Sequence, residues 1–253
     1  MARASGEAVL TRAVRILAVF EPDRAEAGVA EIARLTGLHI ATTSRLVAQL
    51  VELGLLSRLP SGRVGVGMRL WELGQRASPT LSLREAAMPF LEDLHAAIGH
   101  HVQLGVLDGT EVIFLERLSA PGSVVNFTRI AGRLPLHASS SGLVLLAHGS
   151  HDLQERVLAS PLERLTPATV TDPRELRSLL ARVRRDGVVI TEGHIHPEAT
   201  GAATPVRDRH GTVVAALGAV LPNDGRAGGV VAALRAAAHG IARAHTARTS
   251  DSH

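Results

Sequence analysis

The chain has 253 residues, more than one average domain, which favours two domains of unequal size. Its 45% hydrophobic and 20% charged residues are typical of a folded globular protein and exclude extensive disorder. Cysteine is absent, which excludes disulfides, thiolate metal sites and cysteine nucleophiles and favours a reducing, cytoplasmic location.

Every basic residue other than histidine is arginine, and the excess of positive charge lies near the N-terminus. The formal net charge is +3, and residues 1–80 alone hold ten Arg against seven Asp and Glu. Arginine keeps its charge and binds phosphate through a bidentate fork, so this distribution suits nucleic-acid binding. Residues 1–20 lack the apolar core of a signal peptide, and no apolar stretch is long enough for a membrane span.

The first third of the chain predicts three short helices in a helix-turn-helix arrangement. Apolar residues recur at helical spacing over residues 10–20, 29–35 and 39–53. Between the second and third helices, Ala33 allows close helix packing and Gly37, four residues later, permits a left-handed turn.

The third helix is the candidate DNA reader. Its apolar stripe consists of Thr43, Leu46, Val47 and Leu50, and the opposite face carries Ala41, Arg45, Ala48 and Gln49, flanked by Thr42 and Ser44. Short side chains let a helix enter a major groove roughly 12 Å wide. There, Arg45 can reach a guanine or a phosphate, and Gln49 can reach an adenine.

A basic hairpin is expected directly after this helix. Leu55–Arg58 and Arg63–Val66 flank a Pro-Ser-Gly turn, which predicts the wing of a winged helix, and wings usually contact the phosphate backbone. A helical domain that merely carries surface arginine is the alternative, and the wing weighs against it. The predicted DNA-binding domain spans residues 6–68. Its candidate contacts are His39, Ala41, Thr42, Thr43, Arg45, Gln49, Arg58 and Arg63.

The remaining two-thirds predicts a linker helix and an α+β domain with a mostly antiparallel sheet flanked by helices. Apolar spacing predicts a helix over Met68–Ala77. We assign residues 69–80 to a linker helix between the two domains and residues 81–249 to the second domain. The expected helices cover residues 83–94, 143–147, 173–186 and 230–244; the expected strands cover residues 102–106, 111–117, 124–130, 188–191, 200–206 and 213–221.

Short motifs in order along nearly the whole chain resemble those of the IclR family of bacterial transcription regulators. These motifs are Arg12–Leu17, Glu31–Ala33 with Gly37–Leu38, Thr42 with Arg45–Leu46, Leu53–Leu56, Leu70–Gly74, Pro135–Ala138 and Ala203–Val206. Two departures stand out. Leu143 follows Gly142 where the family usually has Lys, and the third helix begins His39-Ile40-Ala41 where the family favours Pro, a basic residue and Ser.

The resemblance implies a GAF-like effector-binding domain and a small organic acid or aromatic metabolite as ligand. It also implies a homodimer joined through the DNA-binding half, often assembled further into a tetramer. Such a dimer would place two recognition helices on a palindromic double-stranded operator, with half-sites about one helical turn apart or a multiple of it.

A serine-rich run is the candidate effector site. Ser139, Ser140, Ser141 and Gly142 precede a short helix, where free backbone N–H groups and hydroxyls can hold a carboxylate. From the residues alone, serines that merely cap the helix are an equal alternative. The family pattern places Thr191, Glu192, Gly201 and Gly218 opposite this run. The two glycines are expected to leave room for an effector with an apolar body.

Other classes of function fit the sequence less well. His100-His101 and the pair His194 and His196 are interpreted as core or surface histidines. Without cysteine, a metal site would need histidine and carboxylate ligands only, and histidine pairs at these short spacings arise easily by chance, so no metal or other cofactor is expected. Hydrolase, phosphate-loop and dinucleotide motifs are lacking, which argues against an enzyme. A ligand-free architectural DNA-binding protein would leave the second domain unexplained. The sequence therefore predicts a transcription regulator whose operator affinity responds to a small carboxylate.

Overall fold

The computed structural model describes residues 7–21, 24–76, 79–119 and 130–250. The chain divides into two compact units, Met1–Ser78 and Pro79–His253. The strand expected over residues 124–130 lies almost entirely outside the described residues. No described helix combines the length and the apolarity that a membrane span requires.

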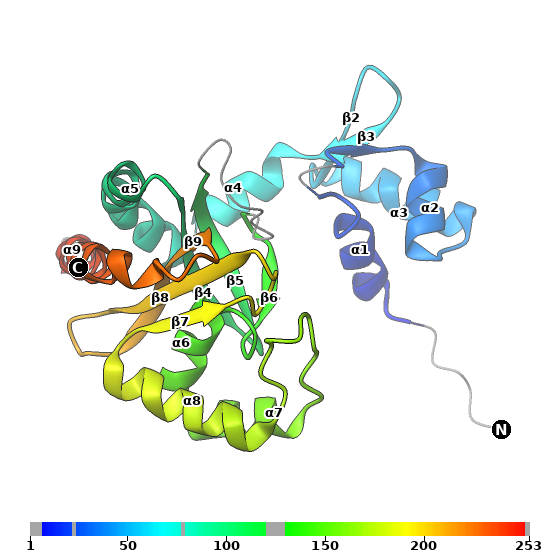
Figure 1. Cartoon of the computed structure of the whole chain (residues 1–253). Coiled ribbons are helices and arrows are strands. Elements are labelled where there is room, and N and C mark those ends of the chain that lie inside the picture. Colours follow the sequence, from blue (N-terminus) through cyan, green and yellow to red (C-terminus); the bar gives the residue numbers. More distant parts are fainter. Residues whose placement is uncertain (1–6, 22–23, 77–78, 120–129, 251–253) are drawn as a thin grey trace. The chain divides into compact units, whose positions relative to one another are not determined.

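The N-terminal unit is a winged helix-turn-helix. It contains α1 (Val9–Leu17), β1 (Glu26–Ala27), α2 (Val29–Thr36), α3 (Ile40–Glu52), β2 (Leu56–Arg58) and β3 (Val64–Val66). The three strands form an antiparallel sheet in the order β1-β3-β2, and the β2–β3 hairpin is the predicted wing (Figure 1). The two-residue strand β1 was not predicted, because a segment this short has no detectable alternation.

One apolar core explains why this unit takes up its fold. The expected stripe of α3 is buried, and Leu46, Val47 and Leu50 pack with Ile16 of α1 and Ile32 of α2. Gly37 ends α2 in the left-handed conformation with φ at +67°, as the turn requires.

Two helices follow the wing. Helix α4 spans Met68–Arg76, and α5 begins at Pro79 and continues to Ile98. Helix α4 corresponds to the helix predicted over Met68–Ala77, whereas residues 79 and 80, the end of the assigned linker 69–80, already belong to α5. Large apolar side chains on α4 are exposed, including the single tryptophan, Trp71, at 61%.

The C-terminal unit has a six-stranded antiparallel sheet, as the α+β prediction required. Its strand order is β6-β5-β4-β9-β8-β7. The strands are β4 (His101–Asp108), β5 (Glu111–Leu118), β6 (Arg133–Pro135), β7 (Val189–Glu192), β8 (Ala199–Arg207) and β9 (Val213–Pro222). All pairings are antiparallel, and β8 and β9 pair along nearly their whole length. The three-residue strand β6 was not predicted.

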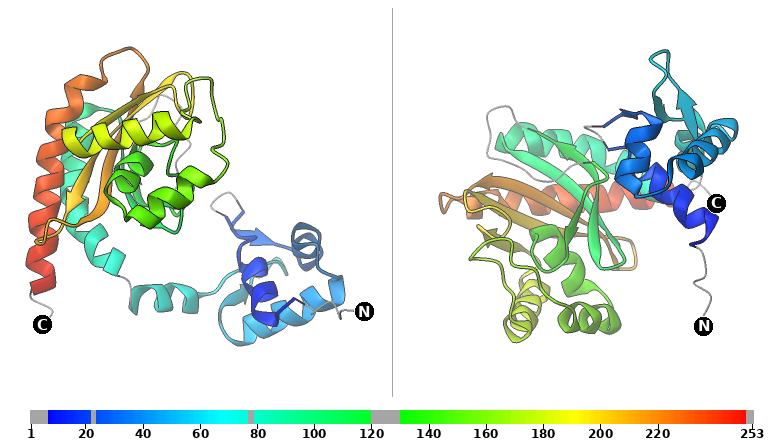
Figure 2. Two further views of the ribbon diagram at one scale, coloured as in Figure 1. Left: turned by 90° about the horizontal axis from the view of Figure 1, so that it is seen from below. Right: turned by 90° about the vertical axis from the view of Figure 1, so that its right-hand side faces the viewer.

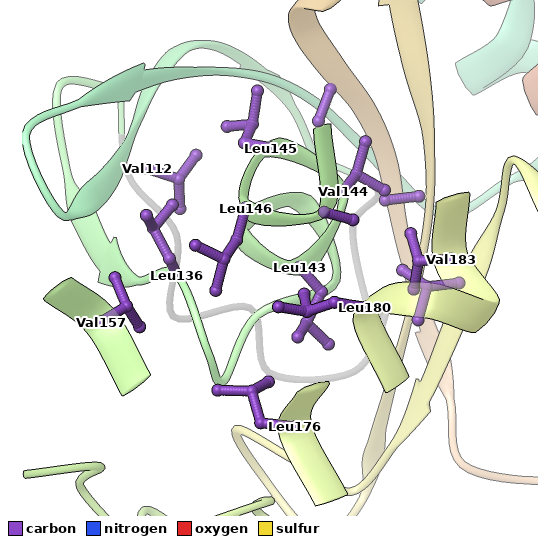
Figure 3. Packing of buried hydrophobic residues seen from close by; sticks show 14 of the residues in the cluster. Val112, Leu136, Leu143, Val144, Leu145, Leu146, Val157, Leu176, Leu180 and Val183 are labelled. Carbon is purple, nitrogen blue, oxygen red and sulfur yellow. The ribbon is translucent and has the colours of Figure 1, made fainter. Parts of the chain in front are cut away.

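Helices cover both faces of this sheet (Figure 2). On one face, α5 and α9 (Val231–Ser250) pack against Leu104 and Leu217, and the short η1 helix (Ala227–Val230) precedes α9. On the other face lie α6 (Ser140–His148), α7 (His151–Ala159) and α8 (Pro173–Asp186). Figure 3 shows the core on this second face, where side chains from α7, α8 and the sheet surround Leu143 and Leu146 of α6.

The helix boundaries follow local signals in the sequence. The Asp172 side chain accepts hydrogen bonds from the N–H groups of Arg174 and Glu175, which lowers the pKa of this carboxyl and begins α8. Gly187 ends the helix with a positive φ of +64°. Helix α7 was not predicted, although Ser150 caps it through a hydrogen bond from the Leu153 N–H group.

Candidate functional site

The first candidate surface is the face of α3 that points away from its core. Ala41, Ser44, Arg45, Ala48 and Gln49 are exposed and lie at the i, i+3, i+4, i+7 and i+8 positions of one helical face. These small and polar side chains leave the backbone accessible to a partner. His39, also exposed, is the N-cap of α3, and its Nδ1 accepts a hydrogen bond from the Ala41 N–H group at 3.3 Å.

The two threonines of the candidate DNA-contact set, Thr42 and Thr43, differ in solvent accessibility. Thr42 is half-buried and borders the exposed face. Thr43 is fully buried, and its hydroxyl donates to the His39 carbonyl at 3.2 Å. Thr43 therefore belongs to the core of the helix-turn-helix and is not available for a base contact.

The two arginines of the wing have different environments. Arg58 ends β2, is exposed, and makes no salt bridge to any described residue. Arg63 is turned toward α2 and β1: its guanidinium lies 2.9 Å from a Glu31 carboxylate oxygen and 3.1 Å from one of Glu26. A hydrogen bond from Gly28 and the interaction with Arg63 hold the pKa of Glu31 below its usual value. Arg63 thus fastens the wing to α2, whereas Arg58 has no carboxylate partner among the residues that the structure describes.

The second candidate site lies at the N-terminus of α6. The Ser139 hydroxyl caps the helix and accepts a hydrogen bond from the Gly142 N–H group at 3.0 Å. The N–H groups of Ser140 and Ser141, in the first turn, have no partner within a helix. All four residues of the predicted run are buried.

The hydroxyls of this turn point at the sheet. A Cβ added at Gly201 of β8 would lie 2.7 Å from the Ser140 Oγ, and one added at Gly218 of β9 would lie 2.9 Å from the Ser141 Oγ. The glycines therefore let α6 approach the strands, and the serines occupy the space that the sequence interpretation left for an effector. The Ser141 Oγ is completely buried and has no hydrogen-bond partner among the described residues.

The two predicted residues of β7 lie on opposite faces of the sheet. Thr191 is buried beside Gly201, and its hydroxyl donates to the Gly201 carbonyl at 3.2 Å. Glu192 is exposed and follows the alternation of the strand away from α6. Of this pair, the structure brings only Thr191 to the serine run.

Two polar residues on β4 belong to the same surface and were not predicted. Gln103 is the register partner of Gly218, and His101 is the partner of Val220, so both share the α6 face of the sheet. Both side chains are buried. The sequence does carry a signal for Gln103. It is a polar residue between Val102 and Leu104 in a part of the strand that is otherwise apolar, and such a strand is buried on both faces.

Histidines lie beside the start of α6. His137 is buried and hydrogen-bonds the Glu163 carbonyl at 2.9 Å. His194 follows β7; burial lowers its pKa, while Glu175 and a hydrogen bond to the Ala138 backbone oppose that shift. Thr169 donates to the His194 carbonyl at 2.7 Å, which fastens this loop. Across the described residues, no three His, Cys, Asp or Glu side chains gather in a way that would hold a metal ion.

Comparisons with known proteins give matches in both units of the chain. Residues 9–60 match the model of the IclR helix-turn-helix domain, and residues 75–243 match that of the bacterial transcriptional regulator IclR C-terminal domain. The chain belongs to the IclR family. It is accordingly a DNA-binding transcription regulator with a C-terminal ligand-binding domain.

Individual family members resemble the chain over most of its length. The HTH-type transcriptional regulator XynR of Escherichia coli is 30% identical over 208 residues, which are 81% of this chain and 82% of XynR. The Pca regulon regulatory protein of Pseudomonas putida is 24% identical and covers 82% of this chain and 72% of its own length. These relatives are regulators.

Solved structures of the family show the same fold. An IclR homolog of Microbacterium hydrocarbonoxydans, complexed with 4-hydroxybenzoate, is 46% identical with a TM-score of 0.90 and covers 95% of this chain and 100% of its own. A further IclR homolog, from Microbacterium sp. strain HM58-2, is 45% identical with a TM-score of 0.62 and covers 94% and 97%.

Proposed function

We propose that this regulator binds a palindromic operator as a homodimer and that a small aromatic carboxylate changes its operator affinity. The observation that carries the effector part is the Ser141 hydroxyl, which is buried without a partner at a helix N-terminus. A buried hydroxyl without a hydrogen bond is costly, so a ligand that accepts from it gains a favourable contact. The helix N-terminus favours a negatively charged ligand.

The chemistry of the neighbouring residues supports a ligand of the 4-hydroxybenzoate class. A carboxylate would accept from the Ser141 hydroxyl and from the N–H groups of Ser140 and Ser141, which have no partner within the helix. Thr191, Gln103 and His101 line the same face of the sheet and supply polar groups for a second substituent. The homolog that is 46% identical to this chain was crystallised with 4-hydroxybenzoate, which supports the same ligand class here.

For the DNA contact, we assign base contacts to the exposed face of α3 and phosphate contacts to Arg58. Arg45 is the only exposed arginine on that face and makes no salt bridge to a described residue. His39, Thr42 and Gln49 border it. Arg63 is assigned to positioning the wing, because Glu26 and Glu31 already hold its guanidinium.

The dimer is supported by an unpartnered apolar face on α1. Leu10 is 79% exposed and Val14 is 63% exposed; they lie four residues apart, next to Val9. Exposed apolar patches of this kind mark protein–protein contacts. An α1–α1 contact would join two DNA-reading units, and further assembly to a tetramer would need a contact elsewhere.

The test is selection of genomic DNA fragments by the purified full-length protein at fixed, moderate salt, repeated with 4-hydroxybenzoate. We expect enrichment of a palindromic site and a change in its affinity of about 5- to 150-fold on adding the acid, the usual range of allosteric coupling. A ligand-free architectural protein would bind equally with and without every acid. Calorimetric binding of only sugars or cations would contradict the proposed effector class.

A further inference from the structure

A second concave surface of the C-terminal unit lies between the end of β8 and helix α9. It is a groove of about 210 Å³. Strand β7 pairs with β8 only as far as Ala203, so the last residues of β8 have a strand partner on one side alone. We call this surface the arginine groove; its lining residues are Gly187, Thr204, Pro205, Arg207, Arg235, Ala238, His239 and Ala242.

Two guanidinium groups of the groove are held by neutral acceptors. Arg207 donates to the Gly211 carbonyl at 2.8 Å and to the His148 Nε2 at 2.9 Å. Arg235 donates to the Asp186 carbonyl at 2.7 Å. Neither arginine makes a salt bridge within the described part of the chain, so both charges stay uncompensated.

Two carboxylates that are adjacent in sequence to groove residues, those of Asp186 and Asp208, have other partners. The Asp186 side chain pairs with Arg185 at 3.0 Å. The Asp208 side chain accepts hydrogen bonds from the backbone N–H groups of His210 and Thr212, at 2.8 and 2.9 Å. Neither of these carboxylates therefore forms a salt bridge with Arg207 or Arg235. The pKa of His148 is lowered, mainly because the ring is partly removed from water. The positive charges of Arg207 and Arg184 lower this pKa further.

We propose that the arginine groove is a second anion-binding site, which takes a small carboxylate with a compact apolar body. Guanidinium groups bind carboxylates in a bidentate geometry, and charge-assisted hydrogen bonds are stronger than neutral ones. Pro205, Ala238 and Ala242 provide apolar walls for the body of the ligand. A volume of about 210 Å³ is below that of sites for drug-sized ligands, which limits the ligand to a small metabolite.

This groove is distinct from the serine-run site at the start of α6. His148, which contacts Arg207, is the last residue of α6, and Ser140 is the first. Their eight-residue separation corresponds to about 12 Å along a helix axis, at 1.5 Å per residue. One small carboxylate therefore does not fill both sites.

The test is a titration of the full-length protein with sodium benzoate, followed by NMR of ¹³C-labelled alanine methyl groups. Ala242 reports the groove, and Ala138, buried beside the serine run, reports the other site. Four forms are compared: wild type, Arg207→Gln/Arg235→Gln, the charge-retaining Arg207→Lys/Arg235→Lys, and Arg156→Gln/Arg182→Gln. The last removes the same charge from exposed positions outside the groove.

We expect a saturable shift of Ala242 in wild type and in the Arg156→Gln/Arg182→Gln control. The glutamine variant of the groove should bind at least about tenfold more weakly, the fold-change for losing one charge-assisted hydrogen bond. The lysine variant should recover part of the affinity, and benzylammonium, with the same ring and the opposite charge, should not shift Ala242. An Ala242 signal that benzoate leaves in place, or that moves equally in the glutamine variant, overturns the proposal. Ala138 shifts test the serine-run site separately.

Discussion

Arg45 shows how one exposed side chain can carry most of the sequence preference of a recognition helix. The variant Arg45→Ala should lose about 1–3 kcal/mol of discrimination at one base pair, because a bidentate contact to guanine distinguishes that base from the other three. Binding of competing operator variants measures this directly. Arg34→Ala, an exposed arginine of α2, is the control and should leave base preference unchanged. Equal relaxation in both variants would contradict the assignment.

The Ser141 hydroxyl is expected to lower the stability of the ligand-free protein and to strengthen effector binding. Because this group is buried without a partner, Ser141→Ala should raise the free energy of unfolding of the ligand-free protein by about 1 kcal/mol or more. The same change should weaken binding of 4-hydroxybenzoate. Urea unfolding and calorimetry on one preparation measure both effects. If Ser141 only capped the helix, Ser141→Ala would lower the free energy of unfolding and leave the affinity for 4-hydroxybenzoate unaltered.

Two half-buried histidines, His148 and His194, make stability depend on pH. Burial lowers the pKa of both His148 and His194, so each binds a proton more readily in the unfolded chain. Below the ordinary imidazole pKa of about 6.5, the unfolded state therefore takes up more protons, and the free energy of unfolding falls as the pH falls. His148→Asn/His194→Asn should flatten this dependence in urea unfolding between pH 7 and about pH 5. The exposed pair His151→Asn/His210→Asn is the control and should keep it.

Among the elements, α6 depends most on close approach to its surroundings. A Cβ at Gly142 would lie 2.6 Å from the Leu136 Cα and 2.7 Å from the Leu136 carbonyl oxygen, and backbone atoms cannot rotate away. Gly142→Ala should therefore lower the free energy of unfolding by about 1–3 kcal/mol. Gly74→Ala, within α4 and facing open space, is the matched control; it should raise stability or leave it unchanged, because alanine is the better helix former. Thermal unfolding compares the two, and destabilisation of both would contradict the argument.

Elements with strong local signals could be predicted from the sequence, and elements without them could not. Helices α3 and α8 have a clear apolar stripe and defined ends, and their predicted ranges agree with the structure within one or two residues. Strands β1 and β6 have two and three residues, so only pairing with a neighbouring strand defines them.

The candidate sites could be predicted by region but not residue by residue. Thr43 lies in the same stripe that predicts α3, and that stripe already implies burial. Thr191 and Glu192 are consecutive on a strand, so they cannot both face α6. The space over Gly201 and Gly218 depends on how closely α6 approaches the sheet, and this packing distance has no signature in one sequence.

For the whole molecule, DNA affinity should depend on the apolar face of α1. Leu10→Glu/Val14→Glu places two charges in the proposed dimer contact and should shift the protein to a lower oligomeric state. Operator affinity should then fall by about 10²- to 10⁴-fold, because each half-site is bound independently. Sedimentation and gel-shift measurements test this, with Leu107→Glu, an exposed leucine of the C-terminal unit, as the control. An unchanged oligomeric state in the α1 variant would contradict the proposed contact.

The exposed position of Trp71 has a practical consequence. The chain has no tyrosine and no second tryptophan, so its intrinsic tryptophan emission comes from one indole on α4, the helix that ends three residues before the first residue of the C-terminal unit. The protein is thus a single-fluorophore reporter as it stands. A spectral change on effector addition would signal an altered environment at α4, and stopped-flow emission would measure how fast that change occurs.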